Sequence, residues 1–164
     1  MTPSKAHTPK HALDRAYLEA GHAVAAWRLG IMLKRLSLNN KKRRNVWDDP
    51  LRNVDFNWVR RNRSAMVERL AAVLVAGVVA QTAFADSEPM DESQERLDDA
   101  MTLLDSHVAS LYGSSVESLQ HDWREFLEHD DARRALDILA SRLLERGKVG
   151  GKAATRILDE HLSK

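Results

Sequence analysis

The stretch Tyr17-Leu18-Glu19-Ala20-Gly21-His22-Ala23-Val24-Ala25-Ala26-Trp27 is the part of the sequence around which we expect the rest of the chain to fold. It predicts the middle of an amphipathic helix, because apolar residues recur at alternating steps of four and three and so share one face. These residues are Leu13, Tyr17, Ala20, Val24 and Trp27. Thr8-Pro9 is a typical helix start and Gly30 a typical stop, so the helix should lie between them.

Two residues of this predicted helix belong to a known catalytic pattern. Glu19 and His22 occupy the second and fifth places of the zinc-protease motif H-E-x-x-H. In that motif two histidines one turn apart hold the metal, and the glutamate polarises the metal-bound water. Leu18 stands where the first histidine should be. The motif is therefore present in outline and lacks one metal ligand.

The similarity extends beyond the motif itself. The segment from Ala16 to Trp27 resembles the catalytic helix of the FtsH-type ATP-dependent zinc metallopeptidases, whose usual form is A-Y-H-E-A-G-H-A-V-x-A-W. Gly21 and the small residues after His22 are typical of that family. The resemblance implies a mainly α-helical, FtsH peptidase-like domain with one small β element after the first helix. It also implies Glu19 as a vestigial general base and His22 as a vestigial zinc ligand.

Later segments continue the resemblance in the same order. Residues 64–85 predict a helix whose centre, residues 70–80, is apolar on all sides. It is similar to the family's second helix, with Gln81 in place of its glutamate. Helical patterns follow over 115–128, 132–146 and 152–162. Within them, residues 138–146, 149–151 and 157–158 are similar to the family's C-terminal helices.

A helix that begins near Asp91 matches the family's helix for the third zinc ligand, an aspartate. The match puts Arg96 at that aspartate, so a second ligand position is lost and its charge reversed. Glu92 and Asp99 lie four before and three after Arg96, on about the same helix face, and are candidate substitute ligands. Our hypothesis is that Arg96 replaces the metal ion by pairing with Glu19. The alternative is that Arg96 points into solvent.

The region after the first helix predicts the small β element. Residues 31–38 and 54–58 each show alternating apolar positions, and the alternation of the first changes phase between Leu33 and Leu36, which suggests a bulge. We expect the two strands to form a hairpin-like element. Residues 39–63 are interpreted as a basic loop and strand insertion within a single domain spanning residues 1–164.

Composition limits the classes of function. The chain has 164 residues, 43% of them hydrophobic, and its 25 basic and 24 acidic residues almost balance. It has no cysteine, which excludes disulfides and thiolate metal sites. The longest apolar run, residues 70–80, is too short to span a bilayer, and no signal peptide or phosphate-binding loop is present. We expect a cytoplasmic protein without an ATPase module and without a membrane partner.

The basic segment 34–63 allows a different interpretation. It holds ten Lys or Arg residues against three Asp, with Trp47, Phe56 and Trp58 among them. Such a mixture can contact phosphates and stack on bases, so a nucleic-acid surface is one alternative. The other is a solvated hairpin tip whose aromatic residues pack inward.

Three function classes follow from the sequence. The first is a catalytically inactive, metallopeptidase-like domain that needs no cofactor and binds a peptide or protein or regulates one. It is favoured because His22 alone cannot hold zinc and Glu19 then has no activated water. The second is an active zinc metalloendopeptidase with rewired ligands, Glu92 or Asp99. The third is a nucleic-acid-binding protein that uses residues 34–63.

Overall fold

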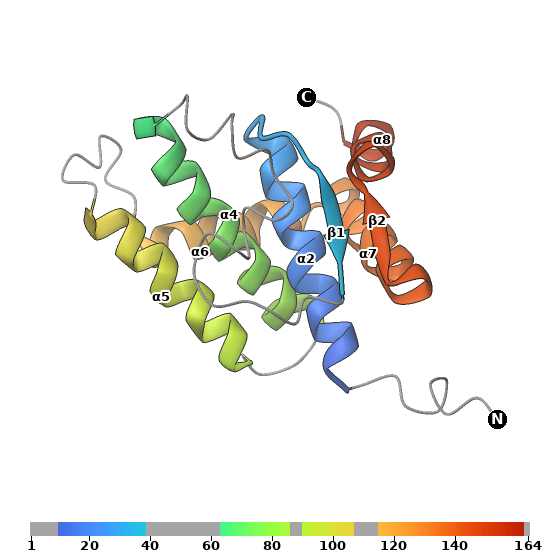
Figure 1. Ribbon diagram of the computed structural model, residues 1–164, viewed down its shortest axis with the longest axis horizontal. Helices are drawn as coiled ribbons and strands as arrows, with labels where there is room; N and C mark the ends of the chain where they lie inside the picture. The colour runs from blue at the N-terminus through green and yellow to red at the C-terminus, as the bar shows by residue number, and fades with distance from the viewer. Residues whose placement is uncertain (1–9, 39–62, 86–89, 107–114, 163–164) are drawn as a thin grey trace.

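The computed structural model describes residues 10–38, 63–85, 90–106 and 115–162. Within them the protein is mainly helical, with one two-stranded antiparallel sheet, which confirms the predicted fold class (Figure 1). The helices are α2 (Lys10–Arg28), α4 (Arg63–Phe84), α5 (Asp91–Ser106), α6 (Val116–Leu127), α7 (Asp130–Arg146) and α8 (Gly151–His161). The strands are β1 (Arg35–Ser37) and β2 (Lys148–Gly150). None of these helices is long and apolar enough to cross a membrane.

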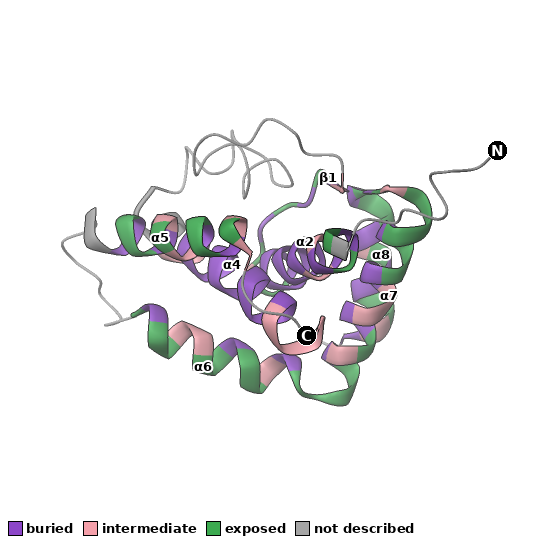
Figure 2. Ribbon diagram, turned by 90° about the horizontal axis from the view of Figure 1, so that it is seen from below, coloured by how far each residue is buried: buried purple, intermediate pink, exposed green. Residues whose placement is uncertain are grey.

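Helices α2 and α4 form the centre of the molecule. Residues 18–27 of α2 and 70–81 of α4 are buried on every side, and the other helices lie around them (Figure 2). The expected one-sided apolar stripe of α2 was therefore wrong in detail. Leu13, its first member, is 42% exposed, whereas Leu18 and Ala25 on other faces are fully buried. A helix covered on all sides needs no polar face, so its periodicity does not report which side is buried.

Small residues let α2 and α4 approach closely. A Cβ atom on Gly21 would lie 2.6 Å from the Cβ of Ala80 and 2.8 Å from the carbonyl oxygen of Ala76. Distances below 3 Å leave no room for a methyl group, so glycine is required where the two helices cross. Gly21 therefore has a packing role in this chain.

Helix ends follow the stop signals in the sequence. Gly30 and Gly147 adopt left-handed backbone conformations, with φ of 75° and 77°, after α2 and α7. Glycine reaches this region without strain and commonly ends a helix there. Ser115 caps α6 by accepting a hydrogen bond from the amide of Ser118.

The first strand has a partner that the sequence did not predict. β1 pairs antiparallel with β2, and Leu36 lies opposite Val149. The predicted second strand, residues 54–58, lies outside the described residues, so its pairing with residues 31–38 stays a prediction. The turn at Gly147 brings β2 back along β1, and the pair buries Leu36 and Val149 on its inner side. The basic insertion, apart from Arg63, also lies outside the described residues.

The predicted change of phase in this region is confirmed. Ile31, Leu33 and Leu36 are buried, and Lys34 and Arg35 are both exposed. Two consecutive exposed residues shift the alternation by one position, as a bulge does.

Tyr17 links α2 to α7. Its hydroxyl donates a 2.6 Å hydrogen bond to Oδ1 of Asp137, which also accepts from Nε of Arg133. Burial, together with this hydrogen bond to a carboxylate, raises the pKa of Tyr17 from 10.0 to about 12. The protonated phenol is thus the form that the fold favours.

We expect Tyr17→Phe to lower the free energy of unfolding by about 1 kcal/mol, the usual contribution of such a hydrogen bond. The stabilisation by the Tyr17 phenol is fully present below pH 10, the ordinary pKa of tyrosine. It is lost as the pH rises to about 12, the pKa of Tyr17 in the folded protein. Ultraviolet titration of tyrosinate in a Tyr112→Phe background isolates Tyr17. An ordinary pKa near 10.0 in the folded protein would contradict the prediction.

Candidate functional site

The motif residues lie inside the protein, on α2. Leu18, Glu19 and His22 are 0%, 1% and 2% exposed. Because Glu19 and His22 are three positions apart on a helix, their side chains are neighbours. Oε2 of Glu19 lies 3.7 Å from Nδ1 of His22, within ion-pair range and beyond hydrogen-bond length. The structure thus brings the predicted base and the predicted ligand together, away from the surface.

The imidazole of His22 packs against α4. A Cβ atom placed on Gly77 would lie 2.2 Å from Nε2 of His22 and 2.3 Å from its Cδ2. The ring edge therefore rests on the backbone of α4, where only glycine leaves room for it. Neither ring nitrogen has a hydrogen-bond partner among the described residues. Buried polar atoms without partners are uncommon, because each costs free energy on burial.

Arg96 is buried, so the alternative that it points into solvent is wrong. It is 1% exposed, and its Nη2 lies 2.8 Å from Oε2 of Glu92, one turn earlier on α5. The other carboxylate oxygen of Glu92, Oε1, lies 2.8 Å from Nη2 of Arg15 on α2. One carboxylate thus bridges two arginines and joins α2 to α5. A direct pair between Arg96 and Glu19 stays a prediction.

A second polar contact joins α4 to α5 beside this ion-pair network. The hydroxyl of Ser93 donates a 2.6 Å hydrogen bond to Oε1 of Gln81, and both residues are fully buried. The resemblance to FtsH-type peptidases would place a glutamate at Gln81. A neutral amide suits this buried place, because it can accept the hydrogen bond without bringing a charge that needs compensation.

These residues do not fit a zinc ion. A zinc site needs three or four His, Asp, Glu or Cys ligands that converge on one point. In the described part of the chain no three such side chains meet in that way. Leu18 has no donor atom, and both oxygens of Glu92 already contact guanidinium groups. Asp99, the other candidate substitute, is half-buried one turn beyond Arg96 on α5.

Sequence reasoning missed Arg15 and Ser93. Arg15 precedes Glu19 by four positions and His22 by seven, so the pattern could have placed it on the same helix face. Ser93 gave no such signal, because its partner Gln81 is on another helix. No protein-family model matches the sequence, and no curated protein matches it significantly.

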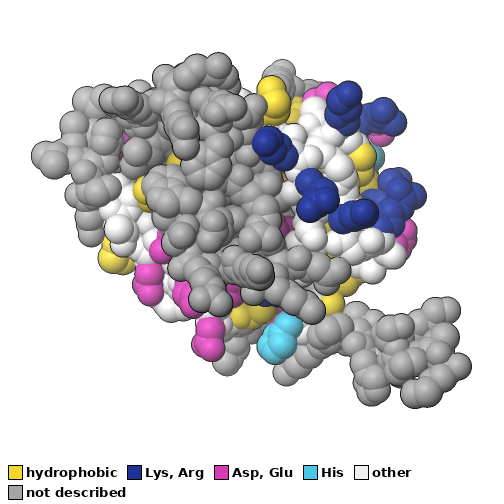
Figure 3. Space-filling view, viewed as in Figure 1, with side chains coloured by type: hydrophobic (Ala, Val, Ile, Leu, Met, Phe, Trp, Pro, Cys, Tyr) yellow, Lys and Arg dark blue, Asp and Glu magenta, His cyan; other side chains and the backbone are white. Residues whose placement is uncertain are grey.

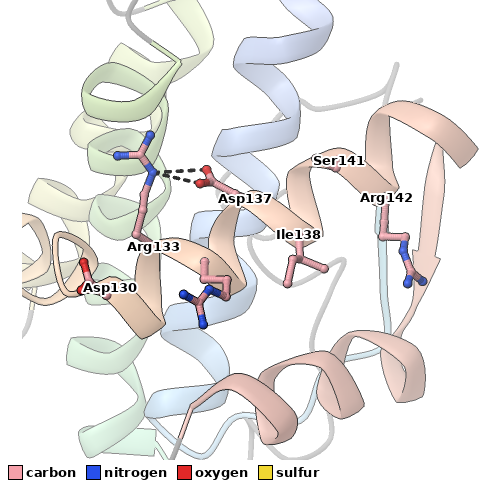
Figure 4. A pocket seen from close by; sticks show the side chains of 7 residues that line it. Asp130, Arg133, Asp137, Ile138, Ser141 and Arg142 are labelled. Atoms are coloured by element: carbon pink, nitrogen blue, oxygen red, sulfur yellow. Dashed lines mark hydrogen bonds and ion pairs between the residues drawn. The ribbon is translucent and has the colours of Figure 1, made fainter.

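Two surface hollows lie away from the motif residues. One, of about 540 Å³, runs along α7 and is lined by Arg133, Arg134, Ile138 and Arg142 (Figure 4). Its Arg133 is already paired with Asp137. The other, of about 350 Å³, lies between the turn after α2 and helix α8. Neither of these two hollows is lined by Glu19 or His22.

Proposed function

We propose that this protein is a degenerate relative of the FtsH-type peptidase domain, without hydrolytic activity, that acts in the cytoplasm as a peptide- or protein-binding or regulatory module. The observation that carries the proposal is the state of the two lost ligand positions. Leu18 is fully buried at one, and at the other Arg96 is buried with its charge compensated by Glu92. Both positions have side chains suited to a packed core rather than to a metal ion.

The chemistry supports the same conclusion. Metal-dependent peptide hydrolysis needs a zinc-bound water, whose pKa falls to about 7, and a base beside it. His22 alone cannot hold zinc specifically, and its Nε2 rests on Gly77. Glu19 is 1% exposed, so it is also out of reach of bulk water. What such a domain retains is a rigid helical scaffold with a surface on which a partner can bind.

We expect the purified protein to contain no stoichiometric zinc and not to hydrolyse casein, with or without added zinc. Elemental analysis measures the zinc content, and a fluorescent casein assay measures the hydrolysis. The double variant Leu18→His with Arg96→Asp should gain zinc affinity, because it restores two ligand positions beside His22. Leu18→Met with Arg96→Met is the matched control, since it removes the same two side chains and adds no strong ligand.

One bound zinc per chain, lost in His22→Ala, would contradict this proposal. It would favour the second candidate, an active metalloendopeptidase, and Glu92→Gln and Asp99→Asn would then show which carboxylate serves as a ligand. Tight, strongly salt-dependent binding of nucleic acid would favour the third candidate instead.

A further inference from the structure

Five exposed basic side chains gather where the sheet meets the start of α8. We call them the basic surface: Lys34, Arg35, Lys148, Lys152 and Arg156. Strand pairing puts Arg35 opposite Gly150 and Ser37 opposite Lys148, on the face away from the buried Leu36 and Val149. Figure 3 shows Lys and Arg side chains concentrated over this part of the molecule.

Helix α8 continues the basic surface. The amide of Gly151 donates a hydrogen bond to the carbonyl oxygen of Lys34, which holds the start of α8 against the residue before β1. Lys152 and Arg156 follow on successive turns of α8, so they share one helix face. Strand and helix thus present their cations side by side.

The charge of this surface is not compensated within the described chain. None of its five cations makes an ion pair there, whereas the buried Arg96 and the half-buried Arg15 and Arg133 each bind a carboxylate. Exposed cations without partners raise the local potential and attract anionic groups. The surface is therefore available to an acidic partner.

An apolar hollow adjoins the basic surface. It is the hollow of about 350 Å³, lined by Trp27, Ile31, Met32 and Leu33 on one side and by Thr155 of α8 on the other. Met32 is 60% exposed. Leu33 directly precedes Lys34, and Thr155 is three positions after Lys152 on α8, where side chains are neighbours, so the hollow borders the basic surface. Asp159, at its edge, already accepts a hydrogen bond from the indole of Trp27.

We propose that this surface binds an acidic peptide segment of a partner protein, with an apolar residue of the peptide in the hollow and its carboxylates on the basic surface. The inference rests on the proposed function as a binding module and names its partner class. Protein interfaces commonly combine an apolar centre, enriched in Met and aromatic residues, with a charged rim. A nucleic-acid backbone would satisfy the cations and leave the hollow around Met32 unfilled.

The test is selection from a library of random short peptides displayed on phage, with the purified full chain as bait. Selected peptides should be enriched in Asp and Glu around one apolar residue.

The affinity of the selected peptides should fall at least about tenfold in the double variant Lys34→Glu with Arg35→Glu, because attraction becomes repulsion at two positions. The affinity should also fall in Met32→Ser. It should decrease as salt is added, because salt screens the attraction between exposed charges. Arg124→Glu with Arg134→Glu, two exposed arginines elsewhere, changes the net charge equally and should bind as the wild type does.

Each contrary outcome has its own meaning. Selected peptides that are not acidic, or that bind the Lys34→Glu/Arg35→Glu variant unchanged, would overturn this inference and leave the proposed binding function intact. Failure to enrich any peptide over the bare matrix would overturn both. If single-stranded DNA binds more tightly than the selected peptides and loses affinity in the same variant, the surface serves nucleic acid, and the peptide assignment is wrong.

Discussion

Arg96→Ala should lower the free energy of unfolding by about 3 kcal/mol, the cost of breaking a buried ion pair from one side. Arg96 is 1% exposed, and its guanidinium meets a carboxylate of which the side chain is only 14% exposed. Removing the arginine leaves Glu92 with less compensation and opens a void at a large buried side chain. Urea unfolding followed by circular dichroism measures the change.

A surface arginine provides the control. Arg142 is exposed on α7, and its replacement by alanine should change the stability by no more than about 0.5 kcal/mol. Arg15→Ala and Arg96→Ala should also be non-additive, because both arginines bind the same Glu92 carboxylate. If Arg96→Ala cost no more than Arg142→Ala, the network would have no structural importance.

Gly77→Ala should destabilise the protein by about 2 kcal/mol, within the range for overpacking a core. Helix propensity alone predicts the opposite sign, since alanine in a helix interior is about 1 kcal/mol better than glycine. The new methyl group would lie 2.2 Å from Nε2 of His22 and 2.8 Å from the carbonyl oxygen of Leu18. A buried ring and a helix backbone both resist the necessary shift, so the steric cost exceeds the propensity gain.

Two further variants separate these effects. His22→Ala removes the ring that the methyl group meets, so in that background Gly77→Ala should cost clearly less. Gly150→Ala is the positional control, because a Cβ there meets nothing within 4 Å and its φ of −66° suits any residue. A Gly77→Ala protein more stable than the wild type would show that α2 and α4 can separate at low cost.

The ion-pair network around Glu92 and the contact of His22 with Gly77 lie among the same three helices. These helices, α2, α4 and α5, are held together there by core interactions. α2 meets α4 through Gly21 and through His22 on Gly77, α4 meets α5 through Gln81 and Ser93, and α5 meets α2 through Glu92 and Arg15. Variants that restore metal ligands therefore also change packing, and their stability should be measured alongside their zinc affinity.

Local features of the sequence were sufficient for much of the fold. Glycines at 30 and 147 end α2 and α7 because the left-handed conformation is open to them, and this preference is a property of the residue itself. The change of phase between Leu33 and Leu36 is likewise local, as is the proximity of Glu19 to His22, which are three positions apart on one helix. Helices, their ends and neighbours within one helix could therefore be predicted.

Only the tertiary structure decided which distant segments meet. β1 pairs with β2, more than a hundred residues later, and no local pattern distinguishes that partner from a nearer strand. The sequence left open whether Arg96 is buried or exposed, because an arginine leaves water only where a partner such as Glu92 compensates its charge. The exposure of Leu13 also depends on distant segments. Periodicity identifies the apolar face of a helix, and the surrounding helices determine whether that face is covered. Strand pairing and charge burial depend on residues far apart in the chain, and their free energy exists only once those residues are in contact.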